Sequence, residues 1–334
     1  MKIAFLVTRL DKPSARYRVL QYLPYLREKG HIPDIVIITK NYWERLTIFG
    51  KMKNYDVVFL QKKPLGAIEC NVLRRHAKTL VYDFDDAVMF RDSQRGDHRS
   101  LRRRRNFIRT VKSSDVVIAG NEYLRSFALK ENPNTFLIPT SVDMERYTER
   151  PTASESKSLI LGWIGSSKTL MYLENMKSVW DTIYDRFPHV KLKIVGDRFF
   201  HCERMPVIKK PWIYEEEIDD LHSFDIGLMP LTDDPWSRGK CGFKLLQYMA
   251  VGVPAVCSPV GVNREIVSDG LNGFWARNEQ EWIEKLGTLI RDLRLRLQMG
   301  KKTRETVIKN YSTEVNQQKL LEVLNSHHHG EVNH

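Results

Sequence analysis

The sequence predicts an α/β protein with two domains, each organised around a doubly wound parallel sheet. Apolar runs of strand length recur along the chain, and the gaps between them are long enough for a helix, as in sheets whose parallel strands are joined by crossover helices. A length of 334 residues is sufficient for two domains that each bury a core. The polar stretch 148–157 is typical of a linker. We therefore expect domains over 1–150 and 157–310.

The composition narrows the class of protein. Hydrophobic residues make up 42% of the chain, and no apolar run approaches the ~20 residues of a membrane-spanning helix. The opening Met1–Thr8 is too short for a signal peptide, and the four cysteines show no metal-binding spacing, so we expect a cytoplasmic protein. The net charge of +12 predicts an anionic partner: a nucleotide, a phospholipid surface or a nucleic acid.

The N-terminal half begins with a βαβ pattern. Lys2–Thr8 is a predicted strand, Ser14–Lys29 carries the apolar stripe of a helix that ends at Gly30, and Asp34–Thr39 is the next strand. Ser14 is a suitable N-cap for that helix. Further buried strands are expected over 55–61, 79–83, 115–120 and 135–139.

The turn between the first strand and helix, Arg9–Arg18, is rich in arginine and contains no glycine. Arg16 or Arg18 can reach an anion from this turn. Each is equally well explained as a charge on the surface of the helix.

The segment Asp83–Asp86 contains three carboxylates and follows a predicted strand, where ligands bind in doubly wound sheets. Three interpretations remain open. The segment can supply a carboxylate pair for a metal in an Asp-x-Asp arrangement, or an acidic wall that positions a substrate hydroxyl, or a cluster that caps a strand end and a helix.

Arg99–Lys112 is the densest basic stretch of the chain. As a helix it spreads positive charge around most of its circumference, and Leu101, Phe107 and Val111 are available for packing. Contact with anionic lipid headgroups fits this pattern at ~1 kcal/mol per basic residue near the surface. No nucleic-acid motif accompanies the run, and a solvated helix is the alternative.

The C-terminal half begins with the predicted strand Leu159–Ile164, followed by Gly165 and a helix. Gly165 permits a close backbone approach, while Ser166, Ser167 and the free N–H groups of the helix start favour an anion. The expected elements that follow are strands 190–196 and 223–230 and helices 279–291, 293–310 and 314–324.

Residues 236–270 combine a basic loop, a helix and a buried strand. Lys240 and Lys244 are four residues apart, so they share one face if the helix starts near the first, and Gln247 lies on the same side. Gly252 ends the helix before strand 254–258. Two ammonium groups and an amide form a plausible cradle for a phosphorylated ligand with hydroxyls, although a solvated lysine face explains the same pair.

The segment Gly239–Pro254 resembles the nucleotide-sugar motif of the family-4 retaining glycosyltransferases, which have the GT-B fold of two Rossmann-like domains facing across a cleft. In most of that family a glutamate opens the motif and a second follows eight residues later. This chain has Gly239 and Gln247 at those positions. The second glutamate usually holds the ribose hydroxyls, and replacing its charge by an amide costs about 1 kcal/mol of binding.

The resemblance implies transfer of a sugar from a nucleotide-diphosphate donor to the hydroxyl of a glycan or lipid-linked acceptor, with retention and without a bound metal or other cofactor. It assigns the leaving diphosphate to the two lysines and the ribose to Gln247, and it favours the acidic wall over a metal pair in the segment Asp83–Asp86. It also implies that a C-terminal helix, 311–325, crosses back onto the first domain. The expected residues are Lys240, Lys244 and Asp86 for catalysis, Gly165, Ser166, Ser167, Gly196, Trp212, Arg238 and Gln247 for the donor, and Arg16, Arg18 and Asp85 on the acceptor side.

Two other functional classes fit the same sequence. The missing glutamates and glycine turn favour a non-catalytic scaffold that binds a sugar, a nucleotide or a lipid surface. A nucleic-acid binder ranks third, so nucleic acid is not an expected partner. A lipid-linked acceptor would place the cytoplasmic protein at the inner face of a membrane through Arg99–Lys112.

Overall fold

The computed structural model describes residues 1–94, 96–151 and 158–328, which form two compact units. The first unit comprises 1–141, 234–241 and the chain from 313 onward, and the second comprises 142–233 and 242–312. The expected ranges, 1–150 with 311–325 and 157–310, differ mainly at the segment 234–241, which the contacts assign to the first unit. Residues 152–157 of the expected linker lie outside the described residues.

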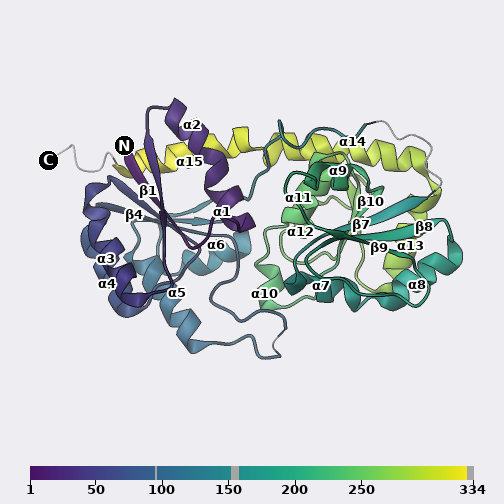
Figure 1. Cartoon of the computed structure of the whole chain (residues 1–334), viewed down its shortest axis with the longest axis horizontal. Helices are drawn as coiled ribbons and strands as arrows, with labels where there is room; N and C mark the ends of the chain where they lie inside the picture. The colour runs from purple at the N-terminus through teal and green to yellow at the C-terminus, as the bar shows by residue number, and fades with distance from the viewer. Residues whose placement is uncertain (95, 152–157, 329–334) are drawn as a thin grey trace. The chain divides into compact units, whose positions relative to one another are not determined.

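The first unit contains a parallel six-stranded sheet (Figure 1). The strand order is β2-β1-β3-β4-β5-β6, which is the doubly wound arrangement that the alternating pattern predicted. The strands are β1 Lys2–Val7, β2 Ile32–Ile37, β3 Val57–Gln61, β4 Thr79–Phe84, β5 Val116–Ala119 and β6 Thr135–Leu137.

Helices cover both faces of this sheet (Figure 1). One face packs on a core that includes Phe49, Leu73 and Phe107, and the other on a core that includes Leu26 and Leu324. The first face carries α3 Tyr42–Gly50, α4 Ala67–His76, α5 Leu101–Ser113 and α6 Glu122–Ala128, and the second carries α1 Pro13–Arg18, α2 Leu23–Glu28 and α15 Thr313–His328. Two 3₁₀ turns, Leu20–Tyr22 and Lys51–Asn54, complete the unit.

The expected single helix over Ser14–Lys29 was wrong, because the structure divides it into α1, a 3₁₀ turn and α2. Val19 leaves the helical region with φ −132° and ψ −65°, and a proline lies in the first turn of α2. Ser14 is not the N-cap, because the helix begins earlier with Pro13 at its first position and Lys12 as the cap.

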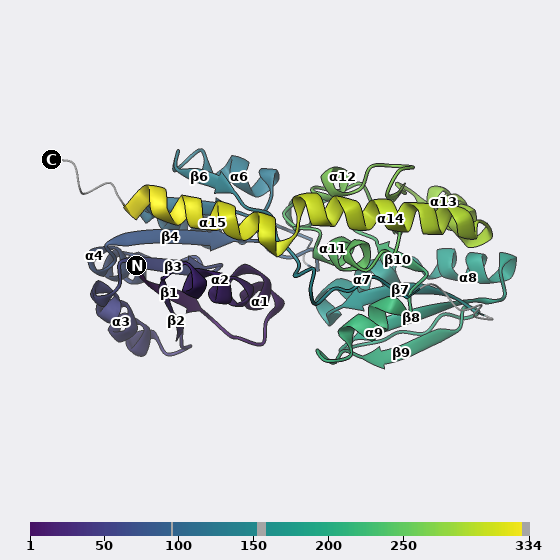
Figure 2. The same cartoon turned by 90° about the horizontal axis from the view of Figure 1, so that it is seen from above.

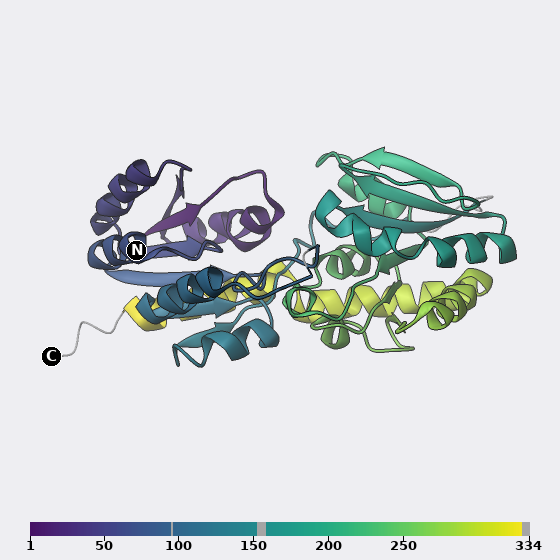
Figure 3. The same cartoon turned by 90° about the horizontal axis from the view of Figure 1, so that it is seen from below.

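The second unit also contains a parallel six-stranded sheet, in the order β12-β11-β10-β7-β8-β9 (Figures 2 and 3). Strand β8 has the expected bounds, whereas β9 was not predicted, because its side chains are largely exposed at the sheet edge. The strands are β7 Leu159–Gly165, β8 Val190–Gly196, β9 Val207–Pro211, β10 Ile226–Met229, β11 Ala255–Cys257 and β12 Gly273–Trp275.

The helices of the second unit begin and end at residues that the sequence makes suitable. Asn278 and Asp292 cap the two long helices by accepting from backbone N–H groups, and both helices have their predicted bounds. Gly252, with φ +79°, follows the end of α11 as expected. The helices are α7 Ser167–Glu174, α8 Lys177–Arg186, α9 Glu217–His222, α11 Phe243–Ala250, α12 Asn263–Ile266, α13 Glu279–Arg291 and α14 Leu293–Asn310, with α10 Pro235–Arg238 in the first unit.

The basic stretch forms α5, which begins at Leu101 and is capped by Ser100. Its first five residues, including four arginines, are exposed, while Phe107 and Val111 are buried. Leu101 does not pack as expected, because 72% of it is exposed. Within the described residues, no helix is long and apolar enough to cross a membrane.

Candidate functional site

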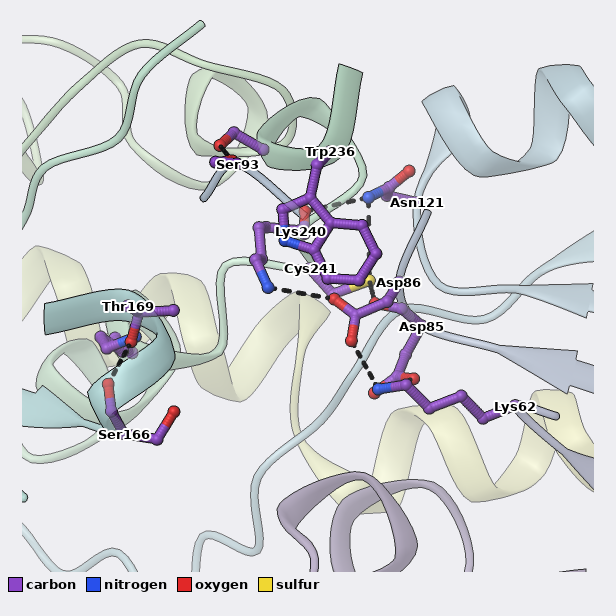
Figure 4. Close-up of polar contacts among 12 residues, drawn as sticks. Lys62, Asp85, Asp86, Ser93, Asn121, Ser166, Thr169, Trp236, Lys240 and Cys241 are labelled. Carbon is purple, nitrogen blue, oxygen red and sulfur yellow. Dashed lines mark hydrogen bonds and ion pairs between the residues drawn. The ribbon is translucent and has the colours of Figure 1, made fainter. Parts of the chain in front are cut away.

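At the carboxyl edge of the first sheet, two lysines and two aspartates form an ion-pair cluster (Figure 4). Lys62 follows β3, and its ammonium lies 3.1 Å from Asp85 Oδ1 and 2.5 Å from Asp86 Oδ2. Lys240 lies 3.3 Å from the other oxygen of Asp86 and 4.8 Å from the centre of the Trp236 ring. Each carboxylate oxygen of Asp86 is therefore held by a different ammonium group.

The electrostatics of this cluster keep Asp86 ionised. Burial alone would raise the pKa of Asp86, but the ammonium groups of Lys240 and Lys62 lower it below its usual value. For Lys62, burial lowers the pKa and the two aspartates raise it further, so the net pKa is above the ordinary value for lysine. A carboxylate of this kind can accept a hydrogen bond from a substrate hydroxyl at neutral pH.

The backbone of Lys62 has a strained conformation, which directs its side chain toward the segment that follows β4. It has φ +65°, the only positive φ at a non-glycine residue within the described ranges. Its N–H donates to the carbonyl of Asp83 at 2.6 Å, and its carbonyl accepts from the Tyr82 hydroxyl at 3.3 Å. These bonds turn the chain at the end of β3 toward the segment that follows β4.

The segment 234–241 is fitted closely to the same edge. Asn121 donates to the carbonyl of Lys240 at 2.9 Å, and the Cys241 thiol donates to the carbonyl of Asp85 at 3.2 Å. Gly239 is required here, because a Cβ on it would lie 2.5 Å from the Cβ of Ala87. Lys240 is therefore positioned in the first unit by backbone contacts as well as by its ion pair.

The acceptor-side arginines do not meet in this cluster. Arg18 is 3% exposed, forms a buried ion pair with Asp83 and donates to the carbonyl of Ile138 at 2.7 Å. The expectation that it reaches an anion was wrong, because its guanidinium is committed inside the unit. Arg16 is half-buried with its guanidinium beside the Tyr17 ring.

In the second unit, Lys244 lies over the end of β7. Its ammonium is 5.2 Å from the centre of the Trp163 ring and 3.3 Å from the hydroxyl of Thr169. A Cβ on Gly165 would lie 2.5 Å from Lys244 Cε, so the glycine makes room for this side chain. Gly165 and Gly196 are paired in the parallel register of β7 and β8, and a Cβ on Gly196 would lie 2.4 Å from the carbonyl oxygen of Gly165.

The start of α7 differs from the expected free anion site. Ser167 donates to Asp197 through its backbone N–H at 2.5 Å and through its hydroxyl at 2.9 Å. The carbonyl of Ser166 accepts from the Thr169 hydroxyl at 3.1 Å (Figure 4). The N–H of Ser167 was therefore wrongly expected to be free, because the carboxylate of Asp197 already occupies it.

The two lysines do not share a helix face. Helix α11 begins at Phe243, after Gly242 with φ +65°, so Lys240 precedes the helix. Lys244 lies in its first turn, in the second unit, whereas Lys240 lies in the first. The left-handed backbone at Gly242 changes the chain direction between them.

Gln247 is buried rather than exposed beside Lys244. Its Nε2 donates to the Tyr147 hydroxyl at 3.2 Å, which in turn donates to Glu217 Oε1 at 2.7 Å. Trp212 donates to the other oxygen of Glu217 at 2.8 Å. The structure thus connects Trp212 and Gln247, two of the predicted donor residues, through Tyr147 and Glu217.

The remaining predicted donor residue, Arg238, is exposed at the end of α10 in the first unit. Among the described residues, no group of three or more His, Cys, Asp or Glu side chains is arranged to hold a metal ion. Asp83 and Asp86 are paired with different cations, Arg18 and the two lysines of the cluster.

Sequence reasoning missed Lys62, Tyr147, Asp197 and Glu217. Lys62 and Asp197 both follow a buried strand directly, so their position at the carboxyl edge was a usable signal. Tyr147 and Glu217 are distant from each other and from Gln247 in the sequence, and no local pattern indicates that they meet.

Comparisons with known proteins were consistent with this architecture. Residues 159–292 match the family model described as glycosyl transferases group 1. No curated protein matches the chain significantly.

Solved structures match over 84% or more of this chain. HepE from Anabaena, in complex with UDP and glucose, is 17% identical with a TM-score of 0.73, over 98% of this chain and 100% of that one. Sucrose-phosphate synthase from Thermosynechococcus elongatus is 14% identical with a TM-score of 0.75, over 97% and 98%. TarM from S. aureus, in complex with fondaparinux, α-GlcNAc-glycerol and UDP, is 16% identical with a TM-score of 0.65, over 84% and 58%. These likenesses confirm the GT-B fold.

Proposed function

We propose that this chain is a glycosyltransferase that uses a nucleotide-diphosphate sugar and retains the anomeric configuration, because residues 159–292 match the model of the group 1 glycosyl transferases and the chain has the GT-B fold. The acceptor is a hydroxyl of a glycan or of a lipid-linked saccharide. HepE and TarM bind UDP in their solved complexes, which supports a nucleotide donor for this chain.

The observation that carries the proposal is the arrangement at the end of β7. Lys244 Cε lies against Gly165, and a Cβ on Gly196 would lie 2.4 Å from the carbonyl oxygen of Gly165. Such bare backbone beside an ammonium group is suited to a diphosphate, which needs close approach and positive charge together. We assign the departing diphosphate to Lys244.

The reaction requires stabilisation of negative charge as the sugar–phosphate bond breaks. A fixed ammonium group in a preorganised site supplies that stabilisation without reorganisation at the moment of reaction. In a retaining reaction of this type the departing phosphate takes the acceptor proton, so no protein base is assigned. The proposed mechanism is independent of a bound metal because the lysine supplies the charge.

The cluster in the first unit is assigned to the acceptor. Asp86 and Asp85 accept hydrogen bonds from its hydroxyls, while Lys62 holds both carboxylates in place and Lys240 holds Asp86. This changes the predicted role of Lys240 from the diphosphate to the acceptor side, because its ammonium pairs with Asp86.

The exposed arginines of α5 support contact with an anionic membrane surface. Helix α5 contains no acidic residue between Leu101 and Ser113. Attraction to anionic headgroups then brings the enzyme to a lipid-linked acceptor at the inner face of a membrane.

A non-catalytic scaffold is the second candidate, and Asp197 favours it. Its carboxylate occupies the N-terminus of α7, where a phosphate would otherwise bind. Gln247, which replaces the glutamate usual in the family that the motif resembles, also favours a scaffold.

One experiment separates the two candidates. Purified protein is screened with UDP-, GDP- and ADP-sugars for thermal stabilisation and for slow donor hydrolysis in buffer containing EDTA. If the protein is an enzyme, one donor raises its melting temperature and is hydrolysed. We expect Lys244→Ala to lose this hydrolysis. A protein that neither shifts nor hydrolyses any donor is a scaffold.

A further inference from the structure

A buried chain of hydrogen bonds runs through the second unit to Gln247. The side chains of Tyr147, Glu217 and Gln247 are 0%, 2% and 3% exposed. They lie on three separate segments, and Arg304 from α14 donates to the carbonyl of Tyr147 at 2.7 Å. The arrangement is therefore built into the fold rather than formed by one flexible loop.

The direction of each hydrogen bond follows from the donors present. The Trp212 indole N–H can only donate, so it donates to Glu217 Oε2. The Arg146 guanidinium lies 3.7 Å from Glu217 Oε1 and balances the charge of the carboxylate. With both oxygens acting as acceptors, the Tyr147 hydroxyl must give its proton to Glu217.

The orientation of the Gln247 amide then has one solution. The Tyr147 oxygen has no proton left to donate, so it can only accept, and the Gln247 group facing it must be the NH₂. None of the hydrogen bonds formed among the described residues uses Gln247 Oε1. The amide therefore presents its carbonyl oxygen, an acceptor like the oxygen of a carboxylate.

We propose that Glu217, acting through Tyr147, is a positioning residue that fixes the acceptor polarity of Gln247 and thereby selects nucleotides whose ribose hydroxyl donates a hydrogen bond. The inference rests on the proposed donor function, with Gln247 facing the ribose as the resemblance of Gly239–Pro254 implies. It explains how an amide serves where a carboxylate is usual: a buried carboxylate elsewhere in the unit decides which end of the amide faces the ligand.

An isosteric change at Glu217 tests the polarity directly. In Glu217→Gln, Trp212 still needs an acceptor, so the new amide turns its oxygen to the indole and its NH₂ to Tyr147. The Tyr147 hydroxyl then donates to Gln247 Oε1, and the Gln247 amide turns its NH₂ outward. Shape and volume are kept, but the ligand meets a donor in place of an acceptor.

The reciprocal change tests the same logic. Gln247→Glu alone places two carboxylates on the single Tyr147 proton, which leaves one oxygen facing a lone pair and destabilises the protein. The double variant Glu217→Gln/Gln247→Glu satisfies every group again, because Tyr147 now accepts from position 217 and donates to position 247. We expect Gln247→Glu to melt below both the double variant and Glu217→Gln, in which every hydrogen bond of the chain is re-formed.

The measurement is the ratio of affinities for a nucleoside diphosphate and its 2′-deoxy-2′-fluoro form, whose fluorine cannot donate, using whichever of UDP, GDP and ADP binds the wild type. We expect about a tenfold preference for the ribose form in the wild type, corresponding to one hydrogen bond. Glu217→Gln lowers the ratio, because an outward NH₂ no longer requires a donor on the ligand, and the double variant restores it. Glu215→Gln, an exposed neighbour, is the matched control and keeps the wild-type ratio.

A wild-type ratio in Glu217→Gln overturns the inference, even if its melting temperature falls. If no nucleoside diphosphate binds the wild type, the proposed donor function fails separately. The melting temperatures of the ligand-free variants then decide the hydrogen-bond direction: recovery in the double variant supports it, and additive losses overturn it.

Discussion

Lys240 and Lys244 are four residues apart in the sequence and end in opposite surroundings. Lys240 lies in the first unit with its ammonium on Asp86, and Lys244 lies in the second over an aromatic ring and beside a hydroxyl. Under the proposed function, Lys240 holds a carboxylate on the acceptor side and Lys244 binds the leaving diphosphate. One short basic motif would then supply two different functions.

The largest effect is expected from removing the anion-binding lysine. Lys244→Ala should cost about 2–4 kcal/mol of transition-state stabilisation, a fall of roughly 30- to 1,000-fold in kcat/KM. Steady-state kinetics with the donor found by screening provide the measurement. Lys244→Arg, which keeps the charge, should retain more activity than the alanine variant. Near-normal turnover in Lys244→Ala would contradict the proposal that Lys244 binds the diphosphate.

A smaller and different loss is expected on the acceptor side. Asp86→Asn should lower kcat/KM for the acceptor by roughly ten- to a hundredfold, because a charge-assisted hydrogen bond to the hydroxyl is lost. Donor hydrolysis without acceptor should stay near the wild-type rate. If donor hydrolysis falls as far as transfer, Asp86 and its lysines belong to donor chemistry instead.

The glycines sharpen the description of the donor side. Gly196→Ala forces a Cβ against the backbone oxygen of Gly165 and should cost about 1–3 kcal/mol of unfolding free energy. Gly165→Ala meets the Lys244 side chain and also the buried Trp163 ring at 2.8 Å, so it should raise the KM for the donor and lower the stability as well. Gly50→Ala, where nothing lies within 4 Å of the new Cβ, is the stability control. Urea unfolding measures the loss of unfolding free energy in Gly196→Ala. Equal losses of unfolding free energy in all three variants would contradict this prediction.

The smallest effect concerns pH. Because the lysines depress the pKa of Asp86 in the folded state, its ion pairs stabilise the protein above the unfolded pKa of about 4. That contribution is lost as the pH falls through the folded pKa. The stability gap between wild type and Asp86→Asn should thus be constant from pH 8 to 5 and narrow below about pH 4. Glu28→Gln, in an exposed pair, should show little gap at any pH. A gap that widens on acidification would contradict the assigned pairing.

Sequence reasoning reached the fold because the alternation of apolar strands and helices is a local pattern. The bounds of β8, α13 and α14 follow from such patterns and were predicted closely. The helix after β1 was mispredicted because a backbone break at Val19 leaves no mark in the spacing of apolar residues.

The site was less predictable for a physical reason. Arg18 and Asp197 have the residue types expected of ligand-binding groups. In the structure, however, Arg18 forms an ion pair with a buried carboxylate, and Asp197 accepts a hydrogen bond from the N-terminus of a helix. Such pairings join residues far apart in sequence. The resemblance of the segment Gly239–Pro254 to a known motif directed attention to this part of the candidate site. The structure was needed to show that Lys240 and Lys244 lie in different units.

The passage of the chain between the units at 141, 233, 241 and 312 has a consequence for recombination. A graft that replaces the first unit by that of a relative must carry three separate stretches: the opening 141 residues, the octapeptide Asp234–Cys241 and the C-terminal helix. A single-junction chimaera would leave a foreign partner for Asp86 and Ala87. Lineages that exchange acceptor halves by one crossover should therefore need compensating substitutions in that octapeptide.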